Sequence, residues 1–191
     1  MNQKFSFEET ELKGAYLVNP FVAEDERGGF VKDYNQDLFL KNGIDHPLKE
    51  VFYTISHKGV IRAIHFQLGH QQAKLVRCVK GHVYDVIVDL RKDSKTFGKW
   101  IGFDLSEDNH REIYIPEFFG HGYLVLEESV VSYKCAENFF PEGDNGIMYN
   151  DPKINIEWPF DLIGGEENLI ISEKDKKLMS LEEYLNAISG N

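Results

Sequence analysis

The chain has 191 residues, 42% of them hydrophobic, and a formal net charge of -11 at pH 7. This length is enough for one full core, and we expect residues 1–191 to form a single domain. The acidic balance argues against nucleic acid or an anionic membrane as a partner. Because no apolar run approaches the roughly 20 residues of a membrane span and the first residues lack a signal-peptide pattern, we predict a cytoplasmic protein.

Short runs rich in Val, Ile, Phe and Tyr alternate with Gly, Asn, Asp and Pro, which is an all-β pattern. In chain order, the predicted strands are Ala15–Val22, Phe30–Tyr34, Val51–Ser56, Val60–Gln67, Ala73–Val79, His82–Leu90, Lys99–Leu105, Glu112–Ile115, Gly122–Leu126 and Val130–Ala136. About ten strands in one domain fit a double-stranded β-helix or jelly roll, the cupin architecture.

Three short segments favour peripheral and C-terminal helices. Asn35 can cap a helix that continues through Lys41. Ser172–Met179 and Ser180–Ile188 each open with a capping-box pattern. The acidic, glycine-containing stretch Glu137–Ile147 is predicted to be a loop.

Ionisable side chains stand on otherwise apolar predicted strands between residues 59 and 90. They are Arg62, His65, Lys74, Arg77 and Asp85. Burying such groups is costly unless they are paired or functional, so we predict a polar cavity inside the fold. For Asp85, pairing with Arg62 or Arg77 explains the carboxylate as well as catalysis does.

Strand alternation assigns Asp85 and one further residue, Tyr133, to faces of their strands. Asp85 and Val86 point to opposite faces of their strand, so Asp85 is expected to border the cavity and Val86 the core. Tyr133 shares an inward face with Val131. A tyrosine, a histidine and a lysine that face one cavity indicate acid–base chemistry, with the histidine as base.

A metal site is not predicted. The cupin metal pattern has a second histidine two residues after the first, but Gln67 stands two residues after His65. His121 alone does not complete a ligand set. Cys78 and Cys135 lie in apolar runs and are expected to be reduced core thiols.

A series of blocks along nearly the whole chain resembles the dTDP-4-dehydrorhamnose 3,5-epimerase family and its sugar-nucleotide epimerase relatives. The blocks are Arg62–Gln67, Ala73–Arg77, Val83–Asp89, Thr96–Trp100, Ile115–Gly122, Tyr133–Lys134, Asn150–Pro152, Trp158–Pro159 and Ile171–Asp175. The resemblance implies a cofactor-free epimerase that acts on a nucleoside-diphosphate 4-keto-6-deoxy sugar in deoxysugar biosynthesis.

The resemblance also implies catalytic roles. His65 matches the base and Tyr133 the acid on the opposite face of the sugar. Lys74 matches the cation that stabilises the enolate, and Asp175 the carboxylate that pairs with the histidine. Because Ser172 precedes Asp175 by three residues, a purely helix-capping role for Asp175 stays open.

The substrate-binding positions are implied in the same way. Arg27, Arg62, His121 and Lys174 match residues that contact the substrate, and Phe139 matches an aromatic residue that stacks on the nucleobase. Arg62 and His65 have opposite parity on a regular strand, so either the strand bulges or one side chain points away.

Several binding positions depart from the family pattern. Lys32 and Asp144 stand where glutamate is common, and Phe52–Ser56 replaces a Gln-x-Asn element. A 3-epimerase, a 3,4-ketoisomerase of similar fold and a non-catalytic sugar-nucleotide-binding cupin therefore remain alternatives. The family resemblance and the predicted edge strands indicate a homodimer.

Overall fold

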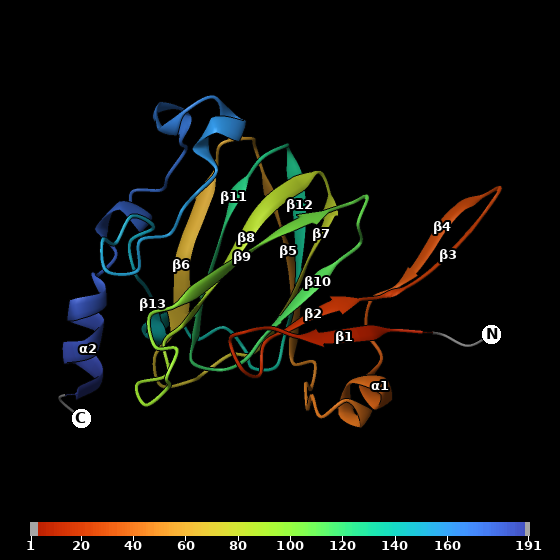
Figure 1. The fold of residues 1–191 in the computed structure, drawn as a ribbon, viewed down its shortest axis with the longest axis horizontal. Helices are drawn as coiled ribbons and strands as arrows, with labels where there is room; N and C mark the ends of the chain where they lie inside the picture. Colours follow the sequence, from red (N-terminus) through yellow and green to blue (C-terminus); the bar gives the residue numbers. More distant parts are fainter. Residues whose placement is uncertain (1–3, 190–191) are drawn as a thin grey trace.

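The computed structural model describes residues 4–189, and its body consists of two antiparallel β-sheets that face one another (Figure 1). One sheet has the strand order β1 (Ser6–Glu9), β2 (Tyr16–Asn19), β10 (Glu112–Ile115), β7 (Lys74–Lys80), β12 (Ser129–Cys135) and β5 (Glu50–Ser56). The other has the order β13 (Asp144–Gly146), β6 (Ile61–Gln67), β11 (Phe119–Val125), β8 (His82–Asp89) and β9 (Trp100–Ser106). Strands β3 (Phe21–Asp25) and β4 (Gly28–Lys32) form a separate hairpin. The predicted all-β fold is confirmed.

The predicted strands differ from the observed ones mainly near the N-terminus and in one loop. The stretch Ala15–Val22 is not one strand, because Pro20 separates β2 from β3 and has no N–H group to donate to a sheet. The strand predicted at Gly122–Leu126 begins earlier, at Phe119. Strand β1 was not predicted, and the predicted loop Glu137–Ile147 contains the short strand β13.

The helices are short and lie at the periphery. Helix α1 (Gln36–Lys41) begins after Asn35, whose side chain accepts a hydrogen bond from the Leu38 N–H. Helix α2 (Leu181–Ser189) has the predicted capping box, because Ser180 and Glu183 exchange hydrogen bonds. The remaining helical turns are the 3-10 turns η1 (Pro141–Gly143), η2 (Phe160–Ile163), η3 (Glu166–Asn168) and η4 (Asp175–Lys177).

The helix predicted at Ser172–Met179 is wrong, because only the turn η4 forms there. Two residues of this segment are held by other parts of the fold: Asp175 contacts His65, and Met179 at the end forms a parallel bridge with Ile147. Tertiary contacts thus override the local helix signal. Within residues 4–189, no helix is long and apolar enough to cross a membrane.

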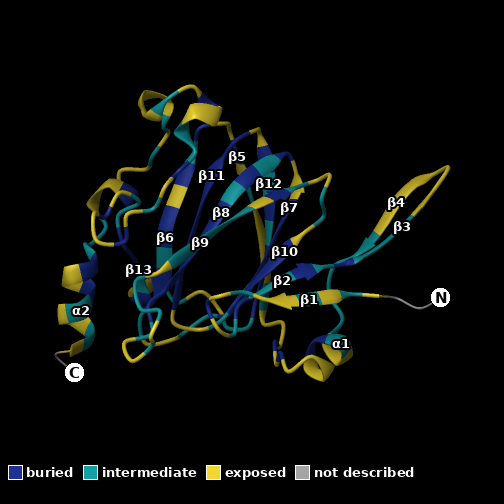
Figure 2. Cartoon of the chain, in the orientation of Figure 1, coloured by how far each residue is buried: buried dark blue, intermediate teal, exposed yellow. Residues whose placement is uncertain are grey.

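Buried hydrophobic side chains form three clusters, and the two larger ones lie on the two faces of the five-stranded sheet. Strand alternation directs Ile87 and Val131 into the core between the two sheets, and Val131 thus faces inward as predicted. Val86 points to the opposite face from Ile87, and it is buried there in a second apolar layer on the outer face of the five-stranded sheet. The C-terminal part of the chain covers that outer face with Trp158 and Tyr184. Figure 2 shows the central strands buried over most of their length and the tip of the β3–β4 hairpin exposed.

Strand β6 bulges where it pairs with β11. His65 pairs with His121, and Arg62 pairs with Tyr123. The two residues on β6 are three positions apart, whereas their partners on β11 are two positions apart, so β6 contains one extra residue. A Cβ atom on Gly122 would lie 2.5 Å from the Ala63 Cβ, so only glycine allows this close approach. The bulge resolves the parity conflict, and both Arg62 and His65 line the same pocket.

A cluster of charged side chains lies on the outer face of the six-stranded sheet, at the base of the β3–β4 hairpin. We call it the hairpin-base cluster; it consists of Asp33, Arg77, Glu112 and Lys134. Asp33 Oδ2 lies 2.7 Å from Lys134 Nζ and 3.6 Å from Arg77 Nη1, and Glu112 faces Arg77 across the sheet. The prediction that Arg77 belongs to the internal cavity is wrong, since β7 alternation sends Lys74 inward and Arg77 outward.

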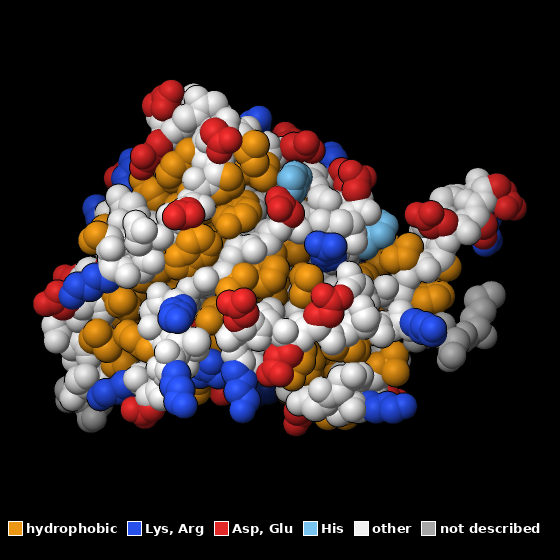
Figure 3. All heavy atoms as spheres, in the orientation of Figure 1, with side chains coloured by type: hydrophobic (Ala, Val, Ile, Leu, Met, Phe, Trp, Pro, Cys, Tyr) orange, Lys and Arg blue, Asp and Glu red, His pale blue; other side chains and the backbone are white. Residues whose placement is uncertain are grey.

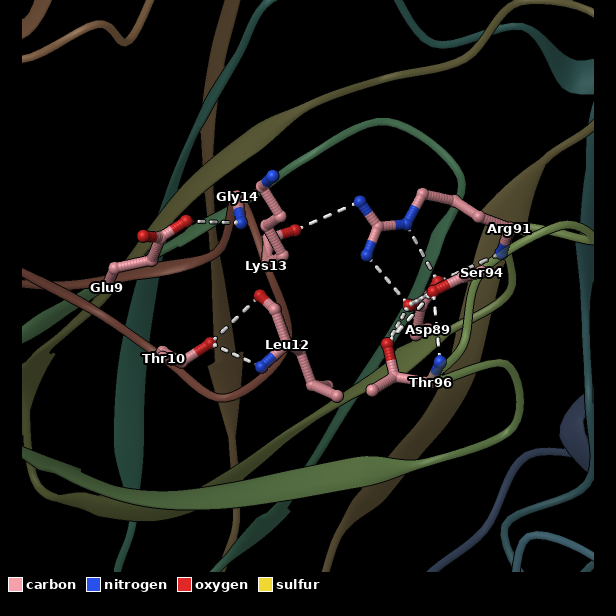
Figure 4. A network of polar contacts seen from close by, with 9 residues as sticks. All are labelled: Glu9, Thr10, Leu12, Lys13, Gly14, Asp89, Arg91, Ser94 and Thr96. Atoms are coloured by element: carbon pink, nitrogen blue, oxygen red, sulfur yellow. Dashed lines mark hydrogen bonds and ion pairs between the residues drawn. The ribbon is translucent and has the colours of Figure 1, made fainter.

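A second polar network fixes the loop after β8 (Figure 4). Asp89 is fully buried and accepts hydrogen bonds from Arg91, Ser94 and Thr96. Burial raises the pKa of Asp89, but these hydrogen bonds outweigh it and lower the value to about 2. Arg91 also donates to the Lys13 carbonyl, which joins this loop to the turn between β1 and β2.

Figure 3 shows acidic and basic side chains interspersed with apolar ones on one face of the molecule.

Candidate active site

A pocket of about 300 Å³ opens between the two sheets and collects most of the predicted site residues. Eight of the eleven line it: Arg62, His65, Lys74, His121, Tyr133, Phe139, Asp144 and Lys174. A larger cavity of about 640 Å³ lies between the loop after β8 and helix α2, and it contains none of the eleven. The chemistry-bearing side chains therefore identify the smaller pocket as the candidate site.

His65 is paired with a buried carboxylate. Its Nε2 lies 3.1 Å from Asp175 Oδ2, and Asp175 is 5% exposed. Burial raises the pKa of Asp175, but the hydrogen bond and charge of His65, helped by Ser172, more than compensate and lower it. The Asp175 N–H also donates to Ser172 Oγ at 3.0 Å, so Ser172 caps this turn while the Asp175 side chain contacts the histidine.

A second histidine–carboxylate pair lies deeper in the barrel. His121 Nε2 is 2.8 Å from Asp85 Oδ2, and both side chains are buried. Burial raises the pKa of Asp85, and the charges of His121 and Lys74 oppose that rise. The predicted partners of Asp85 are wrong: Arg62 donates to Ser56 instead, and Arg77 lies outside the barrel.

Lys74 projects from the first residue of β7 into the pocket. Burial lowers the pKa of its ammonium, and the nearby Cys135, Asp144 and Asp85 oppose the change. Within residues 4–189, no carboxylate lies within 4.0 Å of its Nζ. The Lys74 amine therefore has no direct ion-pair partner within the described part of the chain.

Tyr133 lines the wall opposite His65, because β12 belongs to the six-stranded sheet and β6 to the five-stranded one. Its ring stacks on Phe52 with centroids 4.7 Å apart and meets the His121 ring edge-on at 5.7 Å. Burial raises the pKa of Tyr133 well above its ordinary value, and the neighbouring Tyr123 and Asp85 add to the rise. The phenol is therefore kept protonated.

The pocket mouth carries exposed and charged groups. Phe139 is 51% exposed, and its N–H donates to Glu50. Lys174 forms an ion pair with Asp144, which lies on β13 beside the histidine strand. Arg62 is exposed at the same opening. An exposed aromatic ring beside cations of this kind can stack on a planar ring of a ligand while the cations bind its anionic group.

Two of the predicted binding residues lie outside this pocket. Arg27 is at the turn of the β3–β4 hairpin, where its side chain is 83% exposed and paired with Asp25. Lys32 ends β4. Figure 1 shows this hairpin projecting away from the two sheets. Within the described chain, neither residue reaches the pocket that holds His65.

The sequence analysis gave no site role to four further residues that line or support the pocket: Phe66, Gln67, Gln72 and the buried Tyr123. Phe52 and Thr54 also line it, and they belong to the stretch Phe52–Ser56 that replaces the Gln-x-Asn binding element. Gln67 instead holds the pocket wall, since its side chain contacts the Phe140 N–H and the His70 carbonyl.

Within residues 4–189, no group of three or more His, Cys, Asp or Glu side chains is arranged to hold a metal ion. Cys78 and Cys135 are buried and free, as predicted. Burial raises the pKa of each thiol to about 11.

Comparison with known proteins assigns the family. The model of the dTDP-4-dehydrorhamnose 3,5-epimerase family matches residues 9–183. The chain belongs to this family. It is 45% identical to the dTDP-4-dehydrorhamnose 3,5-epimerase of Methanothermobacter thermautotrophicus over 94% of this chain and 96% of that protein. With the Escherichia coli enzyme of the same name, it is 41% identical over 92% of this chain and 94% of the relative.

Solved structures agree in fold. The dTDP-6-deoxy-D-glucose-3,5-epimerase of Legionella pneumophila, in complex with dTDP-4-keto-L-rhamnose, has a TM-score of 0.88 and 34% identity over 94% of each chain. A 3'-monoepimerase from Streptomyces bikiniensis, in complex with dTDP-quinovose, has a TM-score of 0.85 and 28% identity over 94% of this chain and 90% of that chain. The predicted cupin-type fold is thereby confirmed.

Proposed function

We propose that the protein is a cofactor-independent epimerase that inverts C3, C5 or both of a dTDP-linked 4-keto-6-deoxy sugar. The observation that carries this proposal is a carboxylate-paired histidine and a buried tyrosine on opposite walls of one pocket. Inverting a carbon beside a ketone requires removal of a proton on one face and delivery on the other. Family relatives solved with dTDP sugars support the nucleotide.

His65 is the proposed base. Its Nε2 is bonded to Asp175, so Nδ1 is the ring nitrogen left to accept the sugar proton. The imidazolium that forms is stabilised by the buried carboxylate 3.1 Å away. Asp175 thus fixes the tautomer before the reaction and balances the charge after it.

Lys74 is the proposed stabiliser of the enolate. Removing the proton beside the ketone leaves negative charge on the former ketone oxygen, and a preorganised cation lowers that barrier. Lys74 lines the same pocket and has no carboxylate within ion-pair distance in the described chain. Its charge is therefore available to the oxygen.

Tyr133 is the proposed acid. Its raised pKa keeps the phenol protonated, and Phe52 holds the ring in place by stacking. From the wall opposite His65, the phenol delivers its proton to the other face of the enolate, and the configuration inverts.

The exposed end of the pocket is proposed to hold the nucleotide. Arg62 and Lys174 supply positive charge for a diphosphate, His121 contacts the sugar end, and Phe139 supplies a stacking surface for the base. Asp144 orients Lys174 through their ion pair. These cations counter the net charge of -11 where an anionic substrate enters.

We further propose a homodimer in which the β3–β4 hairpin reaches the partner's pocket. The hairpin projects from its own body and carries Arg27 and Lys32 (Figure 1). Strand β5 is a sheet edge, and its outer side chains Val51, Tyr53 and Ile55 are 60%, 67% and 65% exposed. Such an apolar edge is suited to pairing with a second copy.

The two free, buried cysteines support a reducing compartment, so we propose that the enzyme acts in the cytoplasm. The proposed pathway is deoxysugar biosynthesis for cell-surface polysaccharide. A single cupin-like domain over residues 1–191 is part of the same proposal.

The decisive experiment offers dTDP-, CDP-, GDP- and UDP-linked 4-keto-6-deoxy sugars in heavy water and assigns deuterium at C3 and C5 by NMR. We expect label and inversion with the dTDP sugar and their loss in His65→Ala, with nucleotide binding kept within a few-fold. Inversion at C3 alone identifies a monoepimerase, like the Streptomyces relative. A ketone moved to C3 identifies a ketoisomerase, and binding without exchange identifies a non-catalytic protein.

A further inference from the structure

Phe139, the ring proposed to stack on the nucleobase, has few contacts of its own to fix its orientation. It is 51% exposed, and within residues 4–189 no other aromatic ring stacks on it. It lies in the connection between the end of β12 at Cys135 and the start of η1 at Pro141. Ordering an exposed ring and its loop on a ligand costs affinity. The affinity for a base therefore depends on how firmly the backbone around Phe139 is held beforehand.

Gln67 holds the backbone on both sides of Phe139. It is the last residue of β6 and is 4% exposed. Its Oε1 accepts a hydrogen bond from the Phe140 N–H at 2.8 Å. Its Nε2 donates to the Asn138 carbonyl at 3.4 Å and to the His70 carbonyl at 2.8 Å. Both N–H groups and one lone pair of the carboxamide are thus used by the backbone of the protein.

Glu50 holds Phe139 itself. It is the first residue of β5, and its Oε2 accepts a hydrogen bond from the Phe139 N–H at 2.8 Å. Within the described chain, Glu50 is not among the residues that line the pocket, so its contact with Phe139 is its link to the site. The next ring, Phe140, packs against the His70 ring with centroids 4.4 Å apart. Three consecutive residues, Asn138 to Phe140, therefore each have a backbone group bound by a side chain of β5 or β6.

We propose that Gln67 and Glu50 are positioning residues that set the affinity for the nucleotide by fixing Phe139 before the base binds. We call this pair the Phe139 clasp. Gln67 belongs to the five-stranded sheet and Glu50 to the edge strand of the six-stranded sheet, so the clasp ties Phe139 to both sheets that form the pocket. A group that is ordered in advance costs less to order when the ligand arrives. This inference rests on the proposed function, in which Phe139 stacks on the base.

The test measures the dissociation constants of dTDP and of pyrophosphate by calorimetry for wild type, Gln67→Met and Glu50→Ala. Pyrophosphate carries the anionic group without a base, so its binding reports the cations of the pocket and not Phe139. We expect both variants to bind dTDP about threefold to tenfold more weakly and pyrophosphate within about twofold of wild type. With a dTDP-4-keto-6-deoxy sugar, KM should rise by a similar factor while kcat stays within about twofold.

Two controls separate the clasp from a general effect on the fold. Gln71→Met makes the same substitution four residues later, where the side chain accepts from the Phe118 N–H at 3.2 Å and lines the larger cavity. It should leave dTDP binding unchanged. Glu50→Gln keeps an oxygen that accepts from the Phe139 N–H, so it should restore dTDP affinity to near that of wild type. Circular dichroism checks folding, and the Glu50 variants test the clasp independently if Gln67→Met does not fold.

A double-mutant cycle asks whether the clasp acts through Phe139. Phe139→Ala removes the ring, so adding Gln67→Met should cause no further loss of dTDP binding. A loss that persists without the ring shows that Gln67 acts on the ligand by another route. Equal weakening of dTDP and pyrophosphate shows that the clasp only maintains the pocket, and unchanged dTDP binding in both clasp variants shows that it has no role. Each of these three results overturns the inference.

The proposed catalytic function fails in a different way. A protein whose dTDP affinity responds to the clasp as expected, but which neither exchanges nor inverts the sugar, refutes the epimerase proposal and leaves the clasp intact. A wild type that turns over the sugar with another nucleotide and does not bind dTDP overturns the inference and leaves the epimerase chemistry intact.

Discussion

Replacing Glu112 by glutamine is expected to stabilise the protein, although it removes an ionisable group beside two cations. Glu112 is fully buried, and both of its carboxylate oxygens lack a hydrogen-bond partner in the described chain. Its closest cation is Lys134, whose Nζ lies 3.6 Å away. Burial raises the pKa of Glu112 from 4.5 to about 8, and the charges of Lys134 and Arg77 only partly oppose that rise.

The magnitude follows from the linkage between pKa and stability. When folding raises the pKa of a carboxyl group, the free energy of unfolding is highest below the pKa of the unfolded state. It falls as the pH rises from there towards the pKa of the folded state. Keeping the Glu112 proton at pH 7 therefore costs about 3 kcal/mol, against less than about 1 kcal/mol at pH 5. Glutamine keeps the shape and does not ionise, so Glu112→Gln should avoid this cost.

The assay is urea unfolding of wild type and Glu112→Gln at pH 5, 6, 7 and 8. We expect the stability difference in favour of the variant to grow with pH over this range. Glu117→Gln, which changes an exposed glutamate near the end of the same strand, should give no such trend. If Glu112→Gln is instead destabilising at every pH, the carboxylate is ionised in the fold and Lys134 and Arg77 hold it as a salt bridge.

Four further predictions concern the site and the loop network. Asp89→Asn should lower the free energy of unfolding by about 2 kcal/mol at pH 7. Urea unfolding should show this loss shrinking as the pH falls from 4 towards 2, because the wild-type carboxylate becomes protonated in that range. A loss that does not depend on pH contradicts this. Asp175→Asn should lower turnover and move the acidic limb of the pH–rate profile to lower pH, since the imidazolium loses its partner; a fall in thermal stability alone leaves only the capping role. Tyr133→Phe should still wash deuterium into recovered substrate while forming epimer far more slowly, as read by NMR; an equal fall in both rates refutes the two-face assignment. Exhaustive chelation should leave the epimerisation rate unchanged, and activity restored by one divalent ion would reverse this expectation.

Much of the fold was predictable because the local signals and the tertiary structure agree. Alternation of apolar residues marked most strands, and it assigned Tyr133 and Asp85 to the inner face correctly. The failures occur where long-range contacts decide. Ser172–Met179 carries a helix signal, but the contact of Asp175 with His65 and the bridge at Met179 hold it in another conformation.

The candidate site was predictable to a smaller degree from residue patterns alone. The bulge in β6, which turns Arg62 and His65 towards one pocket, depends on the close approach of Gly122 from a strand more than fifty residues later. No local pattern near Arg62 encodes it. The pairing of Asp85 with His121 likewise depends on β8 and β11 being neighbours, which periodicity does not reveal.

Strand β7 shows how far the two-residue period of a strand reaches. Lys74 faces into the pocket, whereas Arg77, three residues later, faces outward and contacts Asp33 at the base of the β3–β4 hairpin. Because Lys74 and Arg77 are three residues apart on one strand, they point to opposite faces and cannot share one cavity. The two cations therefore have different roles. The inner cation can stabilise an enolate, and the outer one holds the hairpin that carries Arg27. One short strand therefore supports both the proposed chemistry and the element proposed to reach a second copy.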